Sequence, residues 1–259
     1  MHRLRTVLLE WQSQILCLNV GGCKIYRDHH VSEPSEKIEK VIQFLVSPQN
    51  DFVKRIENDK QRPNDLHVGF EAVTKMRGRS GEPDPFVDTV KKFFEDDIPG
   101  TEKLHIILDE DWHSKNDKEW EDWKPHCIKG TEGAALPEEL QEFRFHPRCD
   151  SIQANNVDIS LDDRFQPTIE KYCGNAKPER IRAGIIGVWT HIKVKKLLES
   201  LNRVYPKLDF SNIGICEPLC TSPNKEDHDQ AIKNFKEVYK ANVYSDCDEY
   251  CRHWLGLKF

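Results

Sequence analysis

The sequence contains no uninterrupted apolar run of the length that crosses a bilayer, which takes about 20 residues. The apolar stretches nearest the N-terminus, residues 7–9 and 15–18, are separated by Glu10, Gln12 and Gln14. They do not form the continuous hydrophobic region of a signal peptide, and no small-x-small cleavage site follows them. We therefore expect no membrane association and a cytoplasmic location.

The chain also lacks an excess of positive charge and a paired cysteine framework. Its net charge is −6, with lysines and acids interspersed, which argues against a nucleic-acid partner. Nine scattered cysteines, an odd number, indicate reduced thiols. Cys216-x3-Cys220 and Cys247-x3-Cys251 have a loose resemblance to zinc-ligand pairs. Neither is the tight Cys-x2-Cys pair, so a structural role is favoured for them.

Apolar strands and amphipathic helices alternate along the sequence. Its 259 residues, 37% of them hydrophobic, suit one large α/β domain. We expect an N-terminal arm over residues 1–34 and the domain over residues 35–259. Expected strands lie at residues 41–46, 104–108, 181–188, 210–216 and 243–244, and expected helices at 35–40, 85–96, 167–173, 192–205 and 225–239, with another beginning near Pro137 and a short one ending at Leu255. This order predicts a three-layer sandwich around a central, mostly parallel, Rossmann-like sheet.

A possible ligand set follows the expected strand at residues 104–108. Asp111 and His113 fall at or just past its end, and residues i and i+2 of an extended segment project from the same face. His126 returns after a charged loop to complete the set. Asp, His and His suit a divalent metal such as zinc, with positions left for water or substrate. The alternative is that Asp111 caps a loop and the histidines are ordinary polar residues.

The turn after the strand at residues 181–188 is the second feature of interest. Side chains in the first turn of the next helix meet unpaired N–H groups and the positive end of the helix dipole, where many hydrolases keep a nucleophile. Here the turn offers Thr190, His191 and Lys193. The dipole and partial burial should depress the pKa of Lys193. Facing the crevice, this lysine should pair with a carboxylate or an anion; the alternative is a side chain that extends to solvent.

Four segments, in order over about residues 37–255, resemble the isochorismatase-like superfamily, which includes nicotinamidases and related cysteine hydrolases. Ser47-Pro48-Gln49-Asn50-Asp51-Phe52 is similar to the Asp-x-Gln-Asn-Asp-Phe motif that follows the family's first strand. Asp111-Trp112-His113 and residues 126–134 resemble the zinc-binding segment of nicotinamidases. Residues 187–194 resemble the nucleophile turn, Gly-Val-x-Thr-x-x-Cys-Val, where a cis peptide is often found, and residues 222–235 resemble a later helix.

The departures from this pattern concern the catalytic triad. The resemblance implies an Asp base, a Lys partner and a Cys nucleophile, but Ser47 stands at the Asp position and Lys193 at the Cys position. No lysine lies between Ser151 and Ser160, where the family lysine is expected. The resemblance thus implies that all three triad groups are lost. Cys127 is a substitute nucleophile to consider, although working nicotinamidases carry the same cysteine after the metal histidine.

Two functions remain open. The first is a pseudoenzyme that keeps the pocket of the family to bind a small-molecule ligand. The second is a metal-dependent hydrolase of a small amide or ester that uses zinc held by Asp111, His113 and His126, with Lys193 or His191 polarising the substrate. Ordinary thiol amidohydrolase activity is not expected, because a thiol mechanism needs the nucleophile and its base. The resemblance also implies a homo-oligomer.

Overall fold

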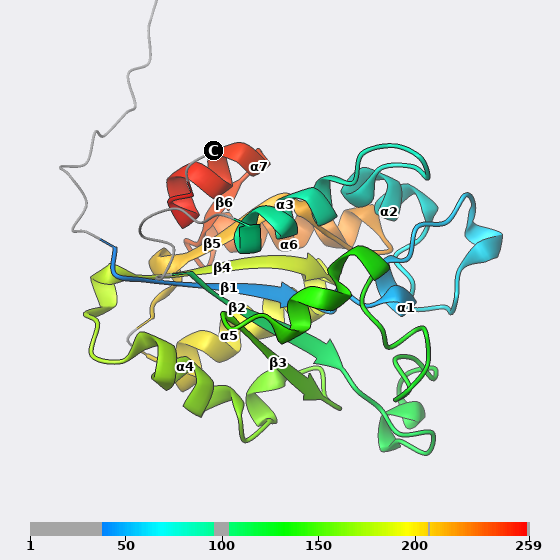
Figure 1. The fold of residues 1–259 in the computed structure, drawn as a ribbon, viewed down its shortest axis with the longest axis horizontal. Coiled ribbons are helices and arrows are strands. Elements are labelled where there is room, and N and C mark those ends of the chain that lie inside the picture. The colour runs from blue at the N-terminus through cyan, green and yellow to red at the C-terminus, as the bar shows by residue number, and fades with distance from the viewer. Residues whose placement is uncertain (1–37, 96–103, 207, 258–259) are drawn as a thin grey trace, which may run out of the picture. The chain divides into compact units, whose positions relative to one another are not determined.

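The computed structural model describes residues 38–95, 104–206 and 208–257, and these contain a single six-stranded sheet (Figure 1). Every strand pair is parallel, and the strand order is β3-β2-β1-β4-β5-β6. The strands are β1 (Lys40–Val46), β2 (Leu104–Asp111), β3 (Cys149–Ala154), β4 (Ile181–Val188), β5 (Ile213–Thr221) and β6 (Asn242–Tyr244). The expected arm at residues 1–34 lies outside the described residues, so its boundary stays a prediction.

Alternate residues of each strand enter two separate hydrophobic cores, one on each face of the sheet. In β1, Val41 and Leu45 join the first core, whereas Ile42 and Phe44 join the second. The helices are α1 (Asn50–Val53), α2 (Phe70–Arg77), α3 (Pro85–Glu95), α4 (Phe165–Cys173), α5 (Lys195–Val204), α6 (Lys225–Glu237) and α7 (Cys247–Glu249). Helices α2 and α3 supply the first core, and α4, α5 and α6 supply the second. The predicted three-layer α/β sandwich is confirmed.

The central strands were predictable because both of their faces are buried. Strand β4 coincides with the expected residues 181–188, and all but one of its residues are buried. Strand β3 was missed because it lies at the sheet edge and carries half-buried polar residues in place of an apolar run. None of the described helices combines the length and hydrophobicity that a bilayer crossing requires.

Several expected boundaries were wrong. The charged helix at residues 35–40 is contradicted at its end, because Lys40 already pairs in β1; residues 35–37 lie outside the described residues. The segment after Pro137 forms a 3-10 helix, Glu138–Phe145. Strand β5 begins only at Ile213, after a 3-10 turn that Asp209 caps by accepting a hydrogen bond from the Ser211 backbone N–H. Strand β2 extends through Asp111, so this carboxylate belongs to the sheet.

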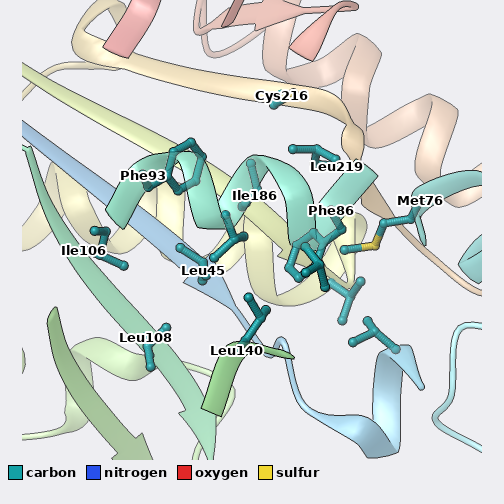
Figure 2. Packing of buried hydrophobic residues seen from close by; sticks show 14 of the residues in the cluster. Leu45, Met76, Phe86, Phe93, Ile106, Leu108, Leu140, Ile186, Cys216 and Leu219 are labelled. Carbon is teal, nitrogen blue, oxygen red and sulfur yellow. The ribbon is translucent and has the colours of Figure 1, made fainter. Parts of the chain in front are cut away.

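The packing of the first core predicts how much stability is lost when one of its side chains is shortened. Figure 2 shows Ile186 of β4 between the side chains of β1 and α3, and it is 0% exposed. Ile186→Ala should lower the free energy of unfolding by roughly 2–5 kcal/mol, because the surrounding side chains cannot fully close the cavity. Urea unfolding measures this loss. Val238→Ala, at a site 69% exposed, is the control, and an equal loss in both variants would contradict the assigned packing.

Candidate functional site

A pocket lies beyond the carboxyl ends of β1, β2 and β4. Ligands in open parallel sheets bind at this edge, because the loops that follow neighbouring strands converge there. Aromatic side chains form part of its wall: Phe52, Trp123 and Trp189. Polar side chains also line it: Ser47, Asp111, Glu119, His126 and Lys193. These side chains come from three separate segments of the sequence, residues 47–52, 111–126 and 189–193.

The Gln49-Asn50-Asp51 segment braces the loops around this pocket. The Gln49 side chain donates to the Asp111 carbonyl at 2.6 Å and accepts from the Asp111 N–H at 2.8 Å. The Asp51 carboxylate accepts a hydrogen bond from the Cys127 N–H at 2.6 Å. These residues thus hold the Asp111 strand end and the Cys127 loop against the end of β1. Their role is to position the site.

Lys193 is the buried cation of the site. It lies in a helical turn, Thr190–Val194, that follows a cis peptide between Val188 and Trp189. Its side chain is 6% exposed and points inward, so the solvent-facing alternative is excluded. The Nζ donates to Ser47 Oγ at 2.9 Å and to Asp111 Oδ1.

A second carboxylate completes the surroundings of the ammonium. Asp109 Oδ1 lies 3.1 Å from Lys193 Nζ as an ion pair, although neither Asp109 oxygen has a well-aligned hydrogen bond among the described residues. With Ser47 and Asp111, three oxygen atoms thus surround a group that has three N–H bonds. Asp109 was not predicted from the sequence. Its i, i+2 spacing from Asp111 places both carboxylates on one face of β2 and could have identified it.

The expected depression of the Lys193 pKa was wrong. Burial does oppose the charged form, but Asp109 and Asp111 outweigh it and raise the pKa of Lys193 above its usual value. Burial also raises the pKa of Asp109, to about 6, against the effect of Lys193. The pKa of Asp111 is lowered: burial opposes ionisation there, but the charges of Lys193 and His126 prevail.

The three expected metal ligands come together. One ligand atom from each of Asp111, His113 and His126 lies within 4.8 Å of the others, and all three residues are buried. His126 Nε2 is 3.6 Å from Asp111 Oδ2, while His126 Nδ1 lies 2.8 Å from the Lys124 carbonyl, to which it donates. That second bond leaves Nε2 as the ligand atom, an arrangement typical of metal-binding histidines.

Two acidic residues that were not predicted from the sequence, Asp117 and Glu119, lie close to His113. Glu119 Oε2 lies 3.2 Å from His113 Nε2, and Asp117 Oδ2 lies 3.5 Å from His113 Nδ1. Asp117 and Glu119 follow His113 by four and six residues in the charged loop, and this closeness in sequence could have predicted them. Burial and the charge of Asp111 raise the pKa of Glu119 to about 7.

The unpaired atoms of this cluster fit a divalent ion. Both ring nitrogens of His113, and Glu119 Oε2, are buried without a hydrogen bond to any described residue. Buried polar atoms normally form hydrogen bonds, so the lack of them at these atoms is consistent with a bound divalent ion. Glu119 thus lies beside the candidate ligand set of Asp111, His113 and His126, in contact with His113.

The other sequence candidates lie away from the pocket lining. His191 Nδ1 is 2.9 Å from Ser222 Oγ, and its ring stacks on Trp189 at 5.9 Å between centroids. Thr190 Oγ1 contacts His228 Nδ1 at 2.9 Å. Cys127 is fully buried, and burial raises the pKa of its thiol well above the usual value. A thiol in that environment is a poor nucleophile.

No known family model and no curated protein matches this chain. Solved structures do match: a nicotinamidase/pyrazinamidase from Bacillus subtilis has 18% sequence identity and a TM-score of 0.61, over 80% of this chain and 100% of that one. An isochorismatase-like hydrolase from Alkaliphilus metalliredigens is 19% identical over 83% of this chain and 99% of its own, with a TM-score of 0.58. A pyrazinamidase from Pyrococcus horikoshii, solved in complex with zinc, is 16% identical over 80% and 99%, with a TM-score of 0.53. The chain therefore has the fold of the isochorismatase-like hydrolases, as its sequence motifs predicted.

Proposed function

We propose that this protein binds a small planar molecule in the pocket and performs no thiol-dependent hydrolysis. The observation that carries this proposal is the Lys193 ammonium, held between Asp109 and Asp111 at the position that resembles the nucleophile of the family. A protonated amine has no lone pair, so it acts neither as nucleophile nor as base. No described cysteine is among the residues that line the pocket.

Ser47 does not substitute for the missing thiol. Its Oγ is 2.9 Å from Lys193 Nζ, a distance suited to a serine activated by a lysine. Such activation needs a neutral lysine that accepts the serine proton. Asp109 and Asp111 raise the pKa of Lys193, which keeps it charged, so Ser47 stays an unactivated hydroxyl.

The pocket wall indicates the chemistry of the ligand. The rings of Trp123 and Trp189 meet edge to face, with centroids 6.0 Å apart, and Phe52 lines the same space. Aromatic walls favour a flat ring, which gains from offset or edge contacts as well as from burial. His126 and Glu119 present polar atoms to an amide or carboxylate on that ring.

A second candidate function, metal-dependent hydrolysis, is favoured by the convergence of Asp111, His113 and His126. A divalent ion in such a site supplies Lewis acidity, which polarises a carbonyl and acidifies water. In this scheme the three residues would hold the ion. Glu119, with its pKa raised to about 7, is the group suited to exchange a proton near neutral pH.

Nicotinamide is the probe that separates these functions. We expect saturable quenching of the Trp123 and Trp189 fluorescence without ammonia release, and weaker binding in Trp123→Leu. Cyclohexanecarboxamide, which has a ring of the same size without aromatic faces, is the matched control and should bind more weakly. Ammonia release that iodoacetamide abolishes would overturn the proposal. Release that requires added zinc and survives iodoacetamide would establish the second function.

A further inference from the structure

A pair of cysteine thiols lies outside the pocket, where α7 packs on β5. Cys216 of β5 pairs in register with Tyr244 of β6, and Cys247 follows three residues later as the first residue of α7. The two sulfur atoms are 3.7 Å apart. Cys216 is buried within the first core, where Figure 2 labels it near Leu219, and Cys247 is only half-buried. One residue of the pair is thus partly exposed, and the other is buried in contact with it.

The two thiols are electrostatically unequal. The hydrogen bond from Cys216 lowers the pKa of Cys247, against the effect of burial. The same bond, together with burial, raises the pKa of Cys216. Among the nearby charges, Asp246 and Asp248 oppose the Cys247 thiolate, and Lys92 favours it less strongly. Because Cys247 is half-buried and Cys216 is buried behind it, Cys247 is the thiol that an oxidant reaches first, and Cys216 is the resolving thiol.

We propose that Cys216 and Cys247 form a reversible disulfide when the protein meets a peroxide. The Cys247 thiolate attacks one peroxide oxygen: an S–O bond forms, the O–O bond breaks, and the leaving hydroxide takes up the Cys216 proton to become water. The Cys216 thiolate then attacks the Cys247 sulfur, and the S–S bond forms as hydroxide leaves. Two electrons pass from the two sulfurs to the peroxide, and a dithiol such as dithiothreitol reverses the change.

The other described cysteines are less accessible or less acidic: Cys173 and Cys251, for example, are buried. Cys149 is also half-buried, but burial raises the pKa of its thiol to about 12. Cys127 and Cys220 are buried, and their sulfurs contact backbone carbonyls at 3.9 Å. Oxidation should therefore be selective for Cys247.

Peptide mapping of the full-length protein after hydrogen peroxide treatment tests the proposal. We expect a Cys216–Cys247 cross-linked peptide, two fewer free thiols than in the reduced protein, and recovery of both thiols with dithiothreitol. The link closes a loop of 31 residues, so it should also raise the unfolding temperature. Cys247→Ser and Cys216→Ala should abolish the cross-link, while Cys149→Ser, the matched control, should behave as the parent.

Three results would overturn the proposal. The first is a parent protein in which both thiols survive peroxide. The second is oxidation of Cys247 to a sulfinic acid without a cross-link. The third is a link from Cys247 to any other cysteine, including Cys17 or Cys23, which lie outside the described residues. If Cys216→Ala does not fold, Cys247→Ser, at the half-buried position, still decides the outcome.

Discussion

Lys193→Met should lower the free energy of unfolding at neutral pH by about 3–5 kcal/mol, the usual cost of removing one partner from a buried ion pair. The variant leaves Asp109 and Asp111 as adjacent buried carboxylates, and Asp109 is 0% exposed. Methionine fills a volume similar to that of lysine, so the loss of stability is due mainly to the missing charge and not to a cavity. Urea unfolding measures it. Lys195→Met, at a side chain 41% exposed, is the matched control and should change little.

The same variant should show a defined pH dependence. The pKa of Asp109 is raised to about 6, above the usual 3.8, so this group costs stability as pH rises through its folded pKa. Without Lys193 that pKa rises further, so the loss caused by Lys193→Met should be larger at pH 8 than at pH 5. Adding Asp109→Asn should recover part of it. An equal loss at both pH values would contradict this electrostatic origin.

His126→Ala should weaken zinc binding by at least about 100-fold, because loss of a direct ligand should exceed the 10–100-fold effect usual for its supporting hydrogen bonds. His126 supplies Nε2 opposite Asp111, and the Lys124 carbonyl fixes its orientation. Titration calorimetry with zinc, followed by metal analysis after dialysis, measures the change. His253→Ala, at an exposed histidine, is the control and should bind as the parent does.

Two further measurements extend this prediction: the zinc affinity of Glu119→Gln, and the binding of nicotinamide by both variants. Glu119→Gln should cause a smaller loss of zinc affinity than His126→Ala, since Glu119 approaches the cluster only through His113. Under the proposed function, both variants should still bind nicotinamide without metal, but more weakly than the parent, because His126 and Glu119 line the pocket. A parent protein that binds no zinc would leave His113 paired only with its acidic neighbours, and the site would then be a recognition surface.

Much of the architecture was predictable from sequence because burial on two faces leaves a simple pattern. Strands β1 and β4 are nearly continuous apolar runs, and both were predicted within one residue. The convergence of Asp111 and His113 followed from strand periodicity. Strand β3 was not predicted, because an edge strand does not require a continuous apolar run. Its pairing with β2 depends on the tertiary structure.

The sequence alone was enough to predict the parallel α/β class, the edge of the sheet that carries the pocket, and the Asp111, His113 and His126 cluster. Only the tertiary structure decided the charge state of Lys193. The helix dipole near Lys193 is a local property, and it predicted a lowered pKa. The carboxylates that reverse this effect come from β2, a distant segment that folding brings within 3.1 Å of the ammonium. Ionisation inside a protein depends on which charges become neighbours after burial, and sequence spacing does not specify those neighbours.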